Sequence, residues 1–178
     1  MPLKALLAAA LSAAGLAAAA IPGAVPDAPA GRPNVASSGA FIAVQFANPD
    51  PQAVLQAWTN PTPAGVQLKT DDRGRRDQPI YTFVIFRGCR VDAAGNCNLT
   101  ADFEVEDPTG KPYVQQKSVR SWVNKPPAPA PAYTLATGYM GLVVERKDMT
   151  GPYKVRMTLT DQVSGVSLHT EQILSIAE

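Results

Sequence analysis

Histidine and cysteine are scarce in this chain: its 178 residues include one histidine, His169, and two cysteines, Cys89 and Cys97. A single histidine cannot build a histidine-rich metal centre, and no Gly-x-Ser-x-Gly motif marks a hydrolase nucleophile. We therefore expect no catalytic residues, no metal site and no cofactor. An unpartnered histidine is usually an exposed or edge-strand residue, and we interpret His169 in that way.

An excess of either charge is also missing. Sixteen Lys and Arg residues stand against fifteen Asp and Glu residues, which gives a formal net charge of +1. Surfaces that bind nucleic acid carry a marked basic excess, because they neutralise phosphates. The balance of charges predicts that this chain has no nucleic-acid partner.

Long apolar runs are absent after the first twenty residues. Residues 1–20 have a weakly basic start and an almost unbroken Ala/Leu run, about the length of a signal-peptide hydrophobic region and short for a membrane span. We predict that residues 1–20 are a signal peptide cleaved after Ala20, with Ala30 as the alternative site. An uncleaved N-terminal anchor is the other possibility. After cleavage we expect no membrane span, and a periplasmic or secreted bacterial protein.

The rest of the composition is typical of an all-β protein, with β-branched residues, Gly and Pro spread along the chain. Residues 21–39 are rich in Pro, Ala and Gly and predict a flexible lead-in. Residues 40–178 then form one domain of about seven antiparallel strands. Asp50 as N-cap and Pro51 at the first helical position predict one short helix that runs to Trp58.

Cys89 and Cys97 flank a turn-forming segment that contains Asp92, Gly95 and Asn96. The strands on either side are expected to pair as a hairpin, which would bring the two cysteines within bridging distance. In an oxidising compartment two such cysteines form a structural disulfide. For a loop of this length the entropic model gives about 2.5 kcal/mol of stabilisation.

The strand before the cysteines is apolar on both faces, which is unusual for an antiparallel sheet. One face carries Tyr81, Phe83 and Ile85, and the other carries Ile80, Thr82, Val84 and Phe86. We assign the second set to the outer face. The helix that ends at Trp58 is one candidate to cover this face, and a partner protein is the other.

Two charged groups have alternative interpretations. The segment Asp71–Asp77 contains three arginines, Arg73, Arg75 and Arg76, which could cradle an anion; a solvated turn neutralised by its own aspartates is the simpler interpretation. The carboxylates Asp102, Glu104 and Glu106 alternate along one strand and could bind a cation, but they are also what keeps an exposed sheet face soluble.

The end of the chain resembles the last two strands of immunoglobulin-like β-sandwiches. An Asp…Gly-x-Tyr corner at Asp148–Tyr153 is followed by an alternating strand, a turn and a closing strand. The resemblance implies that the Tyr153 hydroxyl bonds back to the backbone upstream. It also implies an immunoglobulin-like antiparallel β-sandwich, although the two cysteines lie too close in sequence for the antibody-type bridge between distant strands.

Three hypotheses about function remain. The leading one is an exported non-catalytic module that binds another cell-envelope protein, with Ile80, Thr82, Val84 and Phe86 as its surface. The second is binding of a carbohydrate or envelope polymer by stacking on exposed aromatic side chains, for which the candidates are Trp58, Trp122, Tyr113, Tyr133 and Tyr139. The third is a hydrolase without a recognisable motif, which would need His169 in a deep pocket beside an acid and a hydroxyl.

Overall fold

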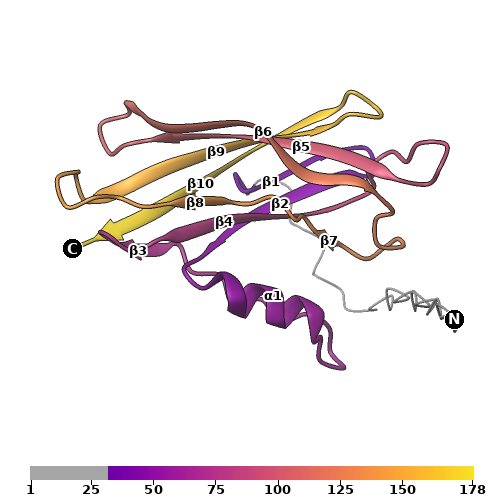
Figure 1. The fold of residues 1–178 in the computed structure, drawn as a ribbon, viewed down its shortest axis with the longest axis horizontal. Coiled ribbons are helices and arrows are strands. Elements are labelled where there is room, and N and C mark those ends of the chain that lie inside the picture. Colours follow the sequence, from indigo (N-terminus) through magenta and orange to yellow (C-terminus); the bar gives the residue numbers. More distant parts are fainter. Residues whose placement is uncertain (1–31) are drawn as a thin grey trace, which may run out of the picture.

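Two β-sheets and one helix make up the computed structural model, which describes residues 32–178 (Figure 1). The predicted signal peptide and both cleavage sites lie outside these residues. Within them, no helix is long and apolar enough to cross a membrane. The all-β class is confirmed.

The first sheet has the order β1-β2-β4-β7, and β8 also pairs with β4. Its strands are β1 (Val35–Ser38), β2 (Phe41–Asn48), β4 (Ile80–Arg87), β7 (Thr134–Leu135) and β8 (Met140–Leu142). Strand β1 falls inside the predicted flexible lead-in, so that the ordered chain begins earlier than residue 40. It forms because its backbone completes the ladder on the free edge of β2.

The second sheet has the order β3-β10-β9-β5-β6. Its strands are β3 (Arg73–Arg75), β5 (Cys97–Glu106), β6 (Pro112–Lys125), β9 (Gly151–Asp161) and β10 (Ser167–Ala177). Alternate residues of β5 and β9 are buried, as their period-two sequences predict. Strand β3 runs parallel to β10 within a segment that we predicted to be a turn.

Strands β4 and β5 do not pair with each other, so the predicted hairpin around the cysteines is wrong. Strand β4 pairs with β2, β7 and β8 in the first sheet, and β5 pairs with β6 and β9 in the second. The segment between Gly88 and Asn96 therefore crosses from one sheet to the other. A period-two pattern shows which side chains share a face, but it does not show which strand is the neighbour.

The assignment of the two faces of β4 is also reversed. Ile80, Val84 and Phe86 are at most 1% exposed and belong to the core between the two sheets, and Thr82 is 0% exposed. These four residues cannot form a partner surface. Phe83 and Ile85, on the other face, pack with Val54 and Trp58 of α1 (Pro51–Thr59).

Helix α1 thus covers the outer face of the first sheet, on the side away from the second sheet (Figure 1). The Asp50 carboxylate accepts hydrogen bonds from Gln52 N–H and Ala53 N–H at 3.0 Å, which confirms the predicted cap. A two-turn helix is marginal by itself, so its packing on β4 holds it in place.

Two hydrogen bonds of the core involve buried polar groups, one between the two sheets and one within the corner before β9. The fully buried Gln45 accepts a hydrogen bond from the Thr170 hydroxyl at 2.7 Å, which links β2 of one sheet to β10 of the other. The Tyr153 hydroxyl donates to the Met149 carbonyl at 2.7 Å, which is the contact that the resemblance implied. Both bonds satisfy buried polar groups that would otherwise destabilise the core.

The first prediction concerns Gly88, where the chain leaves β4. Its φ is +71°, and an added Cβ would lie 2.0 Å from the Ala40 carbonyl oxygen. We expect Gly88→Ala to lower the free energy of unfolding by more than about 3 kcal/mol, because backbone strain and a backbone clash add. Urea unfolding followed by circular dichroism measures this loss.

Gly110→Ala is the matched control. Its φ is +82°, but an added Cβ would meet nothing within 4 Å. Gly110→Ala should lower the free energy of unfolding only by the backbone strain, about 1–2 kcal/mol. Equal losses in the two variants would show that the close approach to Ala40 does not constrain the fold.

Candidate binding site

A disulfide joins the two sheets where β4 leads into β5. Cys89 lies two residues after the end of β4 and Cys97 is the first residue of β5, with their Cα atoms 6.2 Å apart. Cys97 is fully buried and Cys89 is 9% exposed. The predicted disulfide is confirmed, but it bridges a crossing between sheets and not the two strands of a hairpin.

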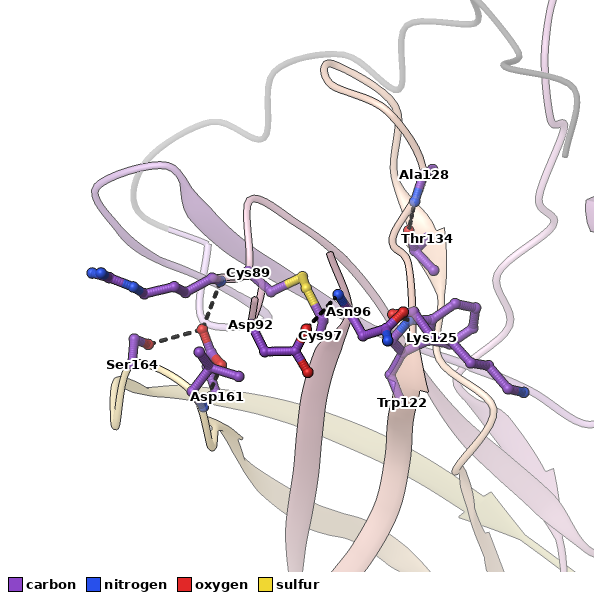
Figure 2. The surroundings of a disulfide bond; sticks show 12 residues. Cys89, Asp92, Asn96, Cys97, Trp122, Lys125, Ala128, Thr134, Asp161 and Ser164 are labelled. Carbon is purple, nitrogen blue, oxygen red and sulfur yellow. Dashed lines mark hydrogen bonds between the residues drawn. A yellow bond between two sulfur atoms is a disulfide. The ribbon is translucent and has the colours of Figure 1, made fainter. Parts of the chain in front are cut away.

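The loop between the cysteines has its own internal bracing (Figure 2). The Asp92 Oδ1 atom accepts hydrogen bonds from Ala94 N–H at 2.8 Å and from Asn96 N–H at 3.0 Å. The backbone closes the same turn, because Asp92 N–H donates to the Asn96 carbonyl at 2.9 Å and Gly95 N–H donates to the Asp92 carbonyl at 3.0 Å. The loop is therefore a fixed turn.

A buried carboxylate ties this loop to the neighbouring turn between β9 and β10. Asp161 is only 1% exposed. Its Oδ2 accepts from Arg90 N–H and from the Ser164 hydroxyl, both at 2.8 Å, and its Oδ1 accepts from Val163 N–H at 3.0 Å. Three donors offset the cost of removing the carboxylate from water. They also fix the position of Arg90 relative to β9.

The proline-rich segment after β6 lies on the other side of the disulfide from Asp161 and Ser164 (Figure 2). Trp122 donates from its indole N–H to the Lys125 carbonyl at 3.0 Å, and the Lys125 ammonium lies 5.4 Å from the centre of the Trp122 ring. Ala128 N–H donates to the Thr134 hydroxyl at 2.8 Å. The start and the end of the proline-rich segment are thus both held.

Three connections therefore meet at one end of the strands, which we call the braced loop end: residues 88–96, 126–133 and 162–166. The Val91 side chain is 45% exposed, and Arg90 beside it is also exposed. In such an arrangement the loops are fixed in place before anything binds to them. Binding to them would order few side chains, which lowers the entropic cost of association.

His169 lines an open hollow of about 330 Å³ together with Asp102, Glu104 and Thr158. It is exposed on the outer face of β10, and its Nδ1 lies 3.0 Å from the Thr158 hydroxyl. Asp102 is the cross-strand neighbour of Thr158 on the opposite side from His169. In a hydrolytic triad the carboxylate hydrogen-bonds directly to the imidazole. Here the Thr158 hydroxyl lies between the His169 imidazole and the Asp102 carboxylate.

The carboxylates Asp102, Glu104 and Glu106 lie on the outer face of the second sheet, as their alternation predicts. The Lys117 ammonium lies 2.7 Å from a Glu104 oxygen and 3.8 Å from an Asp102 oxygen, and Arg156 pairs with Glu106. The hydrogen bond from Lys117 holds the pKa of Glu104 below its usual value. Within residues 32–178, no three His, Cys, Asp or Glu side chains gather as a metal site would require.

The five candidate stacking residues separate into different environments. Tyr133 is buried, and Trp58 is partly buried among the residues between β4 and α1. Trp122 packs edge-on against Phe86, with ring centres 5.8 Å apart. Of the five, only Tyr139 ranks among the exposed large side chains, at 39%.

Tyr113 is engaged inside the protein. Its hydroxyl donates to the Asp148 carboxylate at 2.5 Å, and its ring lies 5.2 Å from the Tyr153 ring. Burial raises the pKa of Tyr113, and the hydrogen bond to Asp148 raises it further. We conclude that Tyr113 fixes the corner before β9 and is not available for stacking.

Tyr81 is a further aromatic residue beside Tyr139, and the sequence did not identify it as a stacking candidate. The Tyr81 ring lies 5.8 Å from the Tyr139 ring at an interplanar angle of 78°, and the Phe83 ring lies 5.0 Å from Tyr139. A Cβ on Gly141 would lie 3.2 Å from the Tyr81 ring. Gly141 in the middle of β8 was the sequence feature that could have indicated this contact, because glycine within a strand marks a close approach by another group.

No protein-family model and no curated protein sequence matches the chain. The solved structures that it resembles weakly include superoxide reductase (neelaredoxin) from Ignicoccus hospitalis and a variant of that protein. The first is 13% identical over 62% of this chain and 79% of that chain, and the second is 14% identical over 73% and 90%. The TM-score is 0.37 in both cases. These matches carry no functional argument.

The second prediction tests the role of Asp161 at the braced loop end. In Asp161→Asn an amide nitrogen replaces one of two accepting oxygens, so that either Arg90 N–H or Val163 N–H loses its acceptor. We expect the free energy of unfolding to fall by about 2 kcal/mol, the cost of a buried donor left without a partner. Thermal or urea unfolding measures this change.

Asp92→Asn is the control, because a single oxygen of Asp92 accepts both of its hydrogen bonds. An asparagine keeps that oxygen, and we expect a loss below about 1 kcal/mol. If Asp161→Asn lowers the free energy of unfolding no more than Asp92→Asn does, the Asp161 carboxylate does not brace the loop end.

Proposed function

We propose that this chain is an exported, non-catalytic β-sandwich module that binds another protein of the bacterial cell envelope through the braced loop end. The signal-peptide pattern of residues 1–20 supports export. The Cys89–Cys97 disulfide supports it too, because such bonds persist in oxidising compartments.

We also propose an immunoglobulin-like arrangement of the strands. In domains of that type one sheet contains strands A, B and E, and the other contains G, F and C. The order β2-β4-β8 in one sheet and β10-β9-β5-β6 in the other supports this correspondence. On this assignment the loops of the braced loop end correspond to those that many such domains use for binding.

The observation that carries the proposal is the triple fixation of the loop between the cysteines. The disulfide, the Asp92 turn and the Asp161 carboxylate each hold a different part of residues 89–97. Rigid loops on a rigid scaffold are the usual position of binding residues. Val91 and Arg90 then offer an apolar side chain and a guanidinium side by side, which suits a protein surface.

The earlier reason for a protein partner no longer applies. Ile80, Thr82, Val84 and Phe86 are buried, and the outer face of β4, with Phe83 and Ile85, is covered by α1 of the same chain. The proposal therefore rests on the braced loop end alone.

The third prediction is that Val91→Asp abolishes capture of the partner while the fold is kept. An aspartate at the centre of an interface places an unpaired charge there, and we expect affinity to fall at least about tenfold. The immobilised mature protein would be exposed to an envelope extract of its native host, and retained proteins identified by mass spectrometry.

Met149→Asp is the control. Met149 is 53% exposed and precedes β9, whose first residue lies at the opposite end of the strands from Asp161. A protein retained by the wild type and by Met149→Asp, but not by Val91→Asp, supports the proposal. A monodisperse monomer that retains no protein in any form contradicts it.

Carbohydrate binding is a second candidate, favoured by the pair Tyr81 and Tyr139. Two rings meet edge to face over Phe83, and neither hydroxyl has a hydrogen-bond partner among residues 32–178. Exposed rings stack on the apolar face of a sugar, and free hydroxyls can bond to its hydroxyl groups.

The fourth prediction tests this candidate with Tyr139→Ala. Loss of a stacking ring should lower the affinity for a bound polysaccharide about tenfold, measured by retardation in gels that contain peptidoglycan fragments or capsular polysaccharide. Val143→Ala, another exposed residue at 48% beyond the end of β8, should have no effect. Equal mobility of wild type and Tyr139→Ala in every gel would exclude this surface.

A further inference from the structure

A hollow of the surface lies at the opposite end of the second sheet from the braced loop end. It measures about 580 Å³ and is lined by strands β3, β9 and β10. Its lining includes Arg73 and Arg75 of β3, Ser175 and Ala177 of β10, and Pro152 of β9. We call this feature the arginine trough.

The sequence places both arginines on the same side of β3. Gly74 lies between them, and a Cβ on Gly74 would lie 2.8 Å from Ile176 Cδ1, so that this position faces the core. Side chains alternate along a strand, and Arg73 and Arg75 therefore both face outward, with Cα atoms about 7 Å apart. A side chain at Gly74 would require the end of the Ile176 side chain to shift.

The hollow exists because the neighbouring outward positions are small. Arg73 pairs with Ser175 and Arg75 with Ala177 in the parallel ladder, and Ser175 pairs with Pro152 in the antiparallel one. Two long cationic side chains thus stand beside a floor without long side chains. The Ser175 hydroxyl has no hydrogen-bond partner among the described residues.

The charges in the trough are not balanced. Arg73 is paired with Asp71, whose carboxylate lies 3.0 Å from the guanidinium Nε. Arg75 has no ion-pair or hydrogen-bond partner for its side chain within residues 32–178. Among the residues that line the trough, two positive charges stand against one negative charge, and the Asp72 carboxylate beside them also acts on Arg73. The third arginine of the segment, Arg76, bonds to Glu178 and to the Arg146 carbonyl instead.

We infer that the arginine trough binds a phosphate group, with Arg75 as its main contact and Arg73 and Ser175 as further donors. Guanidinium groups bind phosphate oxygens in a bidentate manner. A tetrahedral phosphate presents oxygens in several directions, so that two long guanidinium side chains on the same side of β3 can each reach one of them. A carboxylate, with two oxygens in one plane, offers fewer directions for two such donors. This site is independent of the proposed protein interface.

The test is a titration of the full mature protein with inorganic phosphate at constant ionic strength, followed by the backbone amide NMR signals of Gly74, Ser175 and Ala177. We expect saturable shifts of these signals, with an affinity about tenfold lower in Arg75→Gln, since a charge-assisted hydrogen bond is lost. Arg146→Gln is the control, because Arg146 is 89% exposed, is paired with Asp77 and lies outside the trough.

Two further measurements separate the sources of the phosphate. Vesicles of phosphatidic acid in phosphatidylcholine present the group as a lipid headgroup, and sedimentation with them that depends on Arg75 would assign a headgroup to the site. Saturable binding of inorganic phosphate alone would assign a soluble phosphate. Equal shifts with acetate, or equal behaviour of Arg75→Gln and Arg146→Gln in both measurements, would overturn the inference.

Discussion

The structure depends on one constraint, the burial of β4 on both of its faces. Phe83, Val84 and Phe86 are each at most 1% exposed, although they point to opposite sides of the same sheet. A strand of this kind cannot lie in a two-layer protein that has one face in water. The second sheet covers one face, and α1 with its neighbours covers the other. The short helix is therefore part of the core architecture, since without it the outer apolar face of β4 would be exposed.

The same strand explains why the disulfide lies where it does. The chain must leave β4 at Arg87 and enter β5 at Cys97 in the other sheet, and stacked sheets lie about 10 Å apart. A crossing of this kind has no ladder of its own, so its residues need other contacts. The disulfide supplies one of them and Asp161 supplies another. Because Asp161 ends β9, the crossing is fixed to the strand that forms the next loop. The rigidity of the braced loop end is thus a consequence of the topology, and any binding function uses a surface that the fold has already stabilised.

Sequence patterns identified some of these elements and missed others, for identifiable reasons. Asp50 and Pro51 predicted the start of α1, since a cap and a first-turn proline are local signals. The alternation in β5 and β9 predicted exposed and buried faces. The same patterns could not assign the faces of β4, because both are apolar, nor its partners, because pairing is not local. Strand β3 was missed because Arg73 and Arg75 do not suggest a strand; its single inward position is Gly74. The disulfide was predicted from the presence of two cysteines and an expected oxidising compartment. The bracing role of Asp161 was not predicted, because its three hydrogen-bond donors come together only in the folded chain.

The two proposed surfaces lie at opposite ends of the second sheet, which determines how they can act together. Strand β9 runs from Gly151 at the arginine trough to Asp161 at the braced loop end. Ten residue steps of a strand span about 33 Å, and a paired central strand does not shorten or bend easily. A change at one end therefore reaches the other only through a rigid sheet. In a rigid scaffold without a second conformation, two ligands have no coupling free energy to share. Binding at the two ends should consequently be additive, and a protein partner and a phosphate group could be held at the same time at a fixed separation.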